Sequence, residues 1–160
     1  MKKVDLVRIL SITAVVLWMG VIFLLSAQTG ENSGSTSGNI VKILVNFLWR
    51  NFEELSVQKQ REIMEIFQLI VRKGAHFTEY AVLAVLAANA LRTYGVTQKQ
   101  SWGVPVLVCL VYAVTDEVHQ LFVAGRACRA LDVCIDTAGG IFGTACFMLV
   151  CFLLSKRKKT

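Results

Sequence analysis

ITAVVLWMGVIFLLSA, residues 12–27, decides the class of fold. With the residues just before it, this stretch forms an apolar run over about 6–27, close to the ~20 residues that cross a bilayer as a helix. A helix in a soluble core keeps a polar face, and this run has almost none. It therefore predicts a membrane-spanning helix.

Three further apolar runs follow, at about 74–91, 102–123 and 131–154. The whole chain of 160 residues is 55% apolar and only 18% charged, whereas about a quarter of the residues in a soluble domain are charged. We therefore expect an all-α fold, an integral membrane four-helix bundle that forms a single domain over residues 1–160.

The segment between the first two spans has a different composition. Residues 30–39, GENSGSTSGN, predict a flexible loop. Residues 40–71 form an amphipathic segment, in which Lys42, Asn46 and Arg50 recur every four residues on one helical face and 56–71 repeats the amphipathic pattern. We expect one or two amphipathic helices lying in the membrane interface.

Basic residues concentrate at the two ends of the chain, as in the final run KRKK at 156–159. Basic residues of short loops and tails remain on the cytoplasmic side, so we expect both termini in the cytoplasm. Four spans then bring four polar segments to the extracytoplasmic end. The net charge of +6 is explained by these membrane-flanking clusters, and no nucleic-acid partner is expected.

The spacing of the polar residues indicates that they face one another. Three helical stripes are present: Arg72, His76 and Glu79; then Asp116, His119 and Gln120; then Asp132 and Asp136. Each follows i, i+3/i+4 spacing and so lies on one face of its helix. A charged residue facing lipid near the helix centre costs at least about 2.5–3.5 kcal/mol, so we expect the stripes to face the bundle interior.

Two interpretations of this polar zone remain open. Its charges nearly balance: Arg72, Lys73, Arg126 and Arg129 against Glu79, Asp116, Glu117, Asp132 and Asp136. They could therefore pair and only hold the helices together. Buried ion pairs are poor stabilisers, because desolvation offsets most of their attraction, and this favours a functional pocket. Near the last span's centre, Gly139 and Gly143 form a small-xxx-small pattern that predicts packing within the bundle.

Two blocks carry a resemblance to a known family: RKGAHFTEYAVLAVL at 72–86 and TDEVHQLFVAGRACRALDVCIDTAGGIFG at 115–143. Together with SAQTGENSGSTS at 26–37, they resemble the VanZ-like family of bacterial membrane proteins. The resemblance implies four membrane helices in the bacterial plasma membrane and a link to teicoplanin resistance. By motif position, the matching residues are Lys73, His76, Glu79, Tyr80, Asp116, Glu117, His119, Gln120, Arg126, Asp132 and Asp136. The chain departs at Ala124, where the family often has proline.

A binding function is the first hypothesis. Arg72, Lys73 and Arg126 would contact the anionic headgroup of a polyprenyl phosphate or a lipid-linked envelope precursor in the outer leaflet, and so modulate glycopeptide susceptibility. The predicted ligand-binding residues are Arg72, Lys73, His76, Glu79, Tyr80, Asp116, Glu117, His119, Gln120, Arg126, Asp132 and Asp136.

A membrane-embedded hydrolase or transferase acting on a lipid-linked substrate is the second hypothesis. A divalent metal is the cofactor to consider, with His76, Glu79, Asp116 and His119 as candidate ligands. Without metal, His76 or His119 would serve as general base, held by Glu79 or Asp136. A transporter or flippase is the third hypothesis, against which the apolar inner halves of the spans weigh. The sequence leaves the oligomeric state open.

Overall fold

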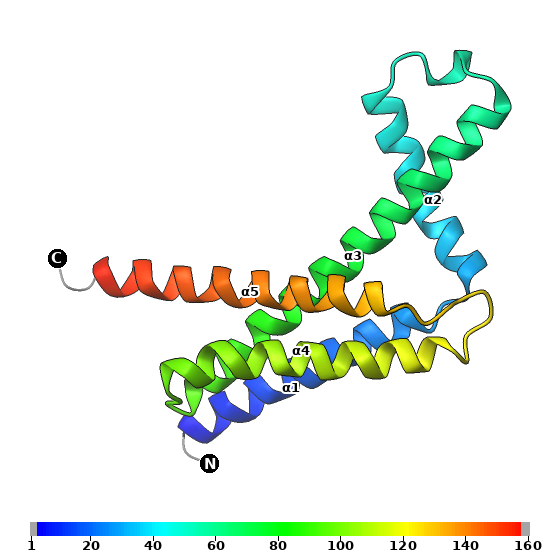
Figure 1. The fold of residues 1–160 in the computed structure, drawn as a ribbon. Coiled ribbons are helices and arrows are strands. Elements are labelled where there is room, and N and C mark those ends of the chain that lie inside the picture. The colour runs from blue at the N-terminus through cyan, green and yellow to red at the C-terminus, as the bar shows by residue number, and fades with distance from the viewer. Residues whose placement is uncertain (1–2, 158–160) are drawn as a thin grey trace.

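The computed structural model describes residues 3–157, and every regular element in this range is helical. The elements are α1 (Lys3–Ser26), α2 (Gly30–Leu48), the 3₁₀ helix η1 (Phe52–Glu54), α3 (Val57–Thr93), α4 (Gln98–Gln120) and α5 (Ala130–Arg157). Helix α3 is central, because it packs against each of the other four α-helices. The first half of α3 and α2 project together from one end of the bundle (Figure 1). The predicted all-α class is confirmed.

Among the described residues, three helices are long and apolar enough to cross a membrane: α1, residues 100–120 of α4, and α5. They expose many large apolar side chains, such as Leu17 and Leu24 of α1 and Phe152 of α5. Such extensive exposed apolar surface is unusual for a soluble monomer and suits contact with lipid. The chain is therefore a helical membrane protein.

Helix α3 differs from the sequence prediction, which placed a break between an amphipathic helix ending at 71 and a span beginning near 74. The structure has one uninterrupted helix of 37 residues, about 55 Å long at 1.5 Å per residue. A glycine such as Gly74 costs a helix only ~1 kcal/mol relative to alanine. The residues of α3 before Gly74 pack against α2, and those after it pack against α5. This packing offsets the cost of the glycine.

The predicted loop over residues 30–39 is also wrong, because α2 begins at Gly30. Tertiary packing overrides the weak helix propensity of this Gly- and Ser-rich stretch. Val41 and Val45 of α2 are buried against α3, in a cluster that includes Phe67 and Val71. Gly38 lies close to Gln68, so that a Cβ added there would be 3.5 Å from its Nε2. We call α2 together with residues 57–71 of α3 the hairpin.

The bundle core joins α1, α3 and α4 through Ile22, Tyr80, Leu83, Ala84, Cys109 and Ala113. Helix α5 approaches this core through glycines: a Cβ at Gly139 or Gly143 would overlap the backbone of Phe77 or Ala81 in α3. A Cβ at Gly140 would lie 2.7 Å from Cβ of Cys109 in α4. The small-xxx-small pattern thus packs within the bundle, as the sequence predicted.

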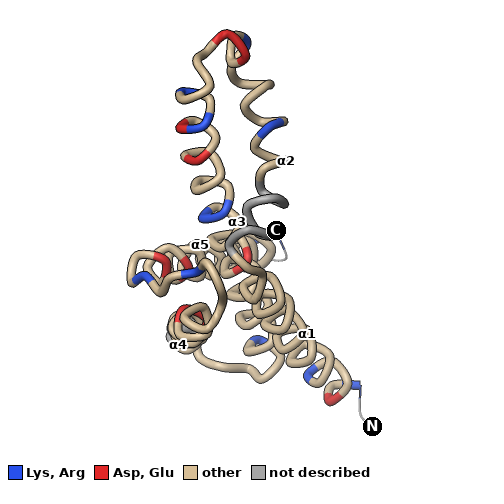
Figure 2. The backbone as a smooth tube through the Cα atoms, turned by 90° about the vertical axis from the view of Figure 1, so that its right-hand side faces the viewer, with Lys and Arg blue, Asp and Glu red and all other residues tan. Residues whose placement is uncertain are grey.

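The first turn of α1 and the last turn of α5 lie at the same end of the bundle, opposite the α4–α5 connection over residues 121–129 (Figure 1). Charged residues follow one another along the hairpin and lie near the ends of α4 and α5 (Figure 2), whereas residues 9–26, 80–91, 100–115 and 137–155 contain no Asp, Glu, Lys or Arg. The polar segments are therefore brought to one end of the molecule.

Candidate functional site

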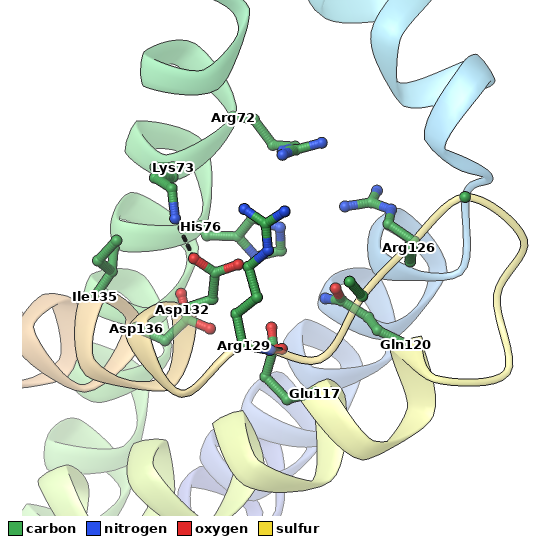
Figure 3. Close-up of a pocket in the computed structure, with 12 residues that line it drawn as sticks. Arg72, Lys73, His76, Glu117, Gln120, Arg126, Arg129, Asp132, Ile135 and Asp136 are labelled. Carbon is green, nitrogen blue, oxygen red and sulfur yellow. Dashed lines mark hydrogen bonds and ion pairs between the residues drawn. The ribbon is translucent and has the colours of Figure 1, made fainter.

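A cavity of about 90 Å³ opens where α3, α4, the 121–129 connection and α5 meet. It is lined by Arg72, Lys73, His76, Glu117, Gln120, Gly125, Arg126, Ala127, Arg129, Asp132, Ile135 and Asp136. Figure 3 shows these side chains converging from separate elements. On the scale of ~10–15 Å³ for each enclosed water, the cavity has room for several waters or for a phosphate-sized group.

One ion pair joins the two helices that flank the cavity. The ammonium of Lys73 on α3 donates to the Asp132 carboxylate in the first turn of α5. Asp136 follows one turn later and is buried, so both acidic residues of this predicted stripe face the same space. The pair leaves the Lys73 charge compensated.

The 121–129 connection is fixed by hydrogen bonds at both sides. Nε of Arg126 donates to the carbonyl of Gln28 at 3.1 Å, and the backbone N–H of Arg129 donates to Oε2 of Glu117 at 2.7 Å. Gly125 turns the chain with a φ of +73°. These contacts direct the side chains of Arg126 and Arg129 toward the cavity (Figure 3).

Three guanidinium groups, those of Arg72, Arg126 and Arg129, share the cavity with the carboxyl groups of Glu117, Asp132 and Asp136. Among the side chains that the structure describes, none of these three guanidinium groups has a carboxylate within 4.0 Å. Partial burial lowers the pKa of Arg126, and the nearby charge of Arg72 lowers it further. Arginine nevertheless remains protonated in proteins. The arrangement is suited to binding an anion with several oxygen atoms.

A second polar cluster lies behind the cavity, between α1 and α4. Oγ of Ser26 donates to Oδ2 of Asp116 at 2.8 Å, while Nε2 of Gln120 donates to Ser26 Oγ at 2.8 Å and to Asp116 Oδ2 at 3.1 Å. All three side chains are buried. Hydrogen bonding to a charged group contributes about 1.5–3 kcal/mol, so this network holds the end of α1 against α4.

The remaining predicted residues do not line the cavity. Glu79 has its carboxylate near His76, with Oε2 at 3.7 Å from Nδ1, and its backbone carbonyl accepts from Nε1 of Trp18 at 2.9 Å. Tyr80 is buried in the core. His119 packs its ring on Phe23, with centroids 4.3 Å apart.

Six buried polar atoms in this region have no hydrogen-bond partner in the described part of the chain: Nδ1 of His76, Oε2 of Glu79, OH of Tyr80, Oδ1 of Asp116, Nε2 of His119 and Oδ1 of Asp136. Buried polar groups are nearly always satisfied in folded proteins, and exceptions concentrate where water, ions or substrates bind. All six belong to residues that the sequence placed in the polar zone.

The model of the VanZ/LLP1 family matches residues 11–153. The chain belongs to the VanZ/LLP1 family. The match covers all of the bundle except the first residues of α1 and the last residues of α5, and it includes every residue that lines the cavity. No curated protein and no solved structure is significantly similar to the chain.

The four predicted metal ligands of this VanZ/LLP1 protein do not meet at one point in the described part of the chain. In the described range, no three His, Cys, Asp or Glu side chains are placed to hold a metal ion. Among the four candidates, His76 and Glu79 approach each other, whereas Asp116 bonds to Ser26 and His119 stacks on Phe23.

Sequence reasoning missed four cavity residues: Gly125, Ala127, Arg129 and Ile135. Arg129 entered only the charge balance, because its direction depends on how the 121–129 connection folds back onto Glu117. Arg129 lies three residues before Asp132 in the sequence, directly before α5. This spacing was the one signal that could have placed it at the cavity. Gly125, Ala127 and Ile135 carry no chemical signal in the sequence.

Proposed function

We propose that the cavity binds the phosphate-bearing headgroup of an anionic lipid in the outer leaflet, such as a polyprenyl phosphate or a lipid-linked envelope precursor. The observation that supports this proposal is that three guanidinium groups, those of Arg72, Arg126 and Arg129, lie at one cavity and have no ion-pair partner among the described residues. Basic pockets between membrane helices suit such headgroups.

The membrane arrangement belongs to the same proposal. Residues 74–91 of α3 form a fourth crossing beside α1, α4 and α5, supported by the burial of Leu83, Ala84 and Ala87 against them. Both termini lie in the cytoplasm of a bacterial plasma membrane. The hairpin then lies at the outer interface, where the exposed Ile43 and Phe47 of α2 contact lipid.

The size of the cavity limits what it encloses. A site for a whole drug-sized molecule occupies some ~300–1,000 Å³, whereas this cavity is about 90 Å³. It therefore holds the phosphate, and the lipid chain and any sugar or peptide remain outside. Binding of the precursor headgroup would change its availability to glycopeptides such as teicoplanin, and this is how the protein would modulate susceptibility.

Binding of farnesyl phosphate to protein in phosphatidylcholine nanodiscs tests the proposal. We expect Arg72→Gln and Arg126→Gln each to weaken binding at least tenfold, because a hydrogen bond to a charged group contributes about 1.5–3 kcal/mol. Arg61→Gln on the hairpin removes the same charge away from the cavity and should bind as the wild type does. Inorganic phosphate, titrated separately, distinguishes a lipid ligand from the free anion. Equal affinity in all four proteins would show the proposal to be wrong.

A further inference from the structure

Anion binding explains the guanidinium groups of the cavity but leaves one neighbouring side chain without a role. His76 lines the same cavity, one helical turn along α3 from Arg72. Histidine is a poor choice for holding an anion, since its charge is lost near neutral pH, and it is the most frequent general acid or base. Its position indicates a function beyond binding.

The two ring nitrogens of His76 have different surroundings. Nδ1 is buried and lies 3.7 Å from Oε2 of Glu79, and within the described residues neither atom has a hydrogen-bond partner. A movement of about 1 Å brings the two atoms to hydrogen-bonding distance. Catalytic hydrogen bonds are often this long before substrate binds. The Glu79 carboxylate then holds the proton on Nδ1, and Nε2 is left as the basic nitrogen for the cavity.

The turn of α3 that carries Glu79 is itself held in place. Nε1 of Trp18 on α1 donates to the Glu79 carbonyl at 2.9 Å, and Tyr80 next to it is fully buried in the core. The His76–Glu79 pair is therefore attached to the packed core of the bundle, while His76 lines the cavity. This is the arrangement of a base and its positioning residue.

The cations beside His76 indicate a class of substrate. Hydrolysis of a phosphate monoester expels an alkoxide, which needs a proton, and guanidinium groups are far too weakly acidic to supply one. Hydrolysis of a phosphoanhydride expels a phosphate, which the guanidinium groups of Arg72, Arg126 and Arg129 can stabilise as an anion.

We propose that this cavity hydrolyses the phosphoanhydride of a lipid diphosphate, with His76 as general base and Glu79 as its positioning residue. This rests on the proposed function, because the same guanidinium groups hold the substrate. The oxygen of a water molecule bonds to the terminal phosphorus, and the bond from that phosphorus to the bridging oxygen breaks. The bonding pair leaves with the lipid monophosphate. One water proton passes to Nε2 of His76 and then to solvent, and the other remains on the released inorganic phosphate.

The test uses the full chain in phosphatidylcholine nanodiscs, with farnesyl diphosphate as substrate and ³¹P NMR as readout, with and without added magnesium. Wild type should release equal amounts of inorganic phosphate and farnesyl phosphate. His76→Gln should slow release by about 100-fold or more while binding farnesyl phosphate with unchanged affinity. Glu79→Gln should lower the rate and move its pH profile. Arg61→Gln, which alters a charged side chain on the hairpin away from the cavity, should retain the wild-type rate.

The outcomes separate this inference from the proposed function. A wild type that binds farnesyl phosphate but releases no phosphate would overturn hydrolysis and leave binding intact. A wild type that does neither overturns both. Undiminished release by His76→Gln removes His76 from the mechanism. Cleavage of inorganic pyrophosphate as fast as farnesyl diphosphate would show that the substrate is the free anhydride and not a lipid.

Discussion

Replacing Gly143 with alanine tests the closest approach between two helices. A Cβ at this position would lie 2.7 Å from the carbonyl carbon and 2.8 Å from Cα of Ala81, and nearer still to its carbonyl oxygen. These are backbone atoms of α3, which cannot rotate away as a side chain can. Helix α5 must therefore move off α3 to accommodate one methyl group.

The magnitude follows from two opposing effects. Alanine stabilises a helix by ~1 kcal/mol relative to glycine, whereas overpacking a tight interior costs about 1–3 kcal/mol. Gly20 of α1 provides the matched control, because a Cβ there meets no atom within 4 Å. Both variants gain the same helix propensity, so the difference between them isolates the clash. We expect Gly143→Ala to be less stable than Gly20→Ala by about 1–3 kcal/mol.

The assay is reversible unfolding in dodecylmaltoside micelles with increasing SDS, followed by far-UV circular dichroism. Displacement of α5 should also weaken farnesyl phosphate binding, because Asp132 and Asp136 in its first turns line the cavity. If Gly143→Ala proves as stable as Gly20→Ala, α5 does not pack on α3 at this glycine and the reasoning fails.

Three smaller changes test the contacts around the cavity. Lys73→Met breaks the pair with Asp132, in which the side chains of Lys73 and Asp132 are 22% and 27% exposed. We expect the free energy of unfolding in the micelle assay to fall by no more than about 1 kcal/mol, and exchanging the two charges should restore part of it. A larger loss would contradict this expectation. Ser26→Ala leaves Oδ2 of buried Asp116 with fewer donors and should cost about 1–3 kcal/mol in the same assay; no change in stability would show that the network contributes nothing. Arg126→Lys keeps the charge but loses the bidentate geometry and the bond to the Gln28 carbonyl, so titration of farnesyl phosphate should give an affinity between those of wild type and Arg126→Gln.

The convergence of polar residues was predictable from the sequence because it depends on helix geometry alone. Neighbours on one helical face are three or four residues apart, and the alternation of helix directions brings the start of α5 beside the end of α4. Arg72 with His76, and Asp132 with Asp136, therefore line one cavity as expected. What these residues bind stays a prediction.

The errors arose where tertiary contacts decide the outcome. The Gly- and Ser-rich stretch at 30–39 has the local composition of a loop, and only packing of Val41 and Val45 on α3 explains why it is helical. Asp116 was expected at the cavity, but its orientation depends on Ser26, ninety residues away in the chain. The spacing of residues in the sequence determines which of them share a helical face. It does not determine which neighbouring helix that face contacts.

The unbroken α3 has a mechanical consequence. Its first half belongs to the hairpin, its second half to the bundle, and Arg72 and His76 lie where the two halves join. Because α3 is one continuous helix, a force that tilts the hairpin also displaces one wall of the cavity. Thickening or curvature of the surrounding bilayer would thereby change the shape of the cavity without any direct contact to it.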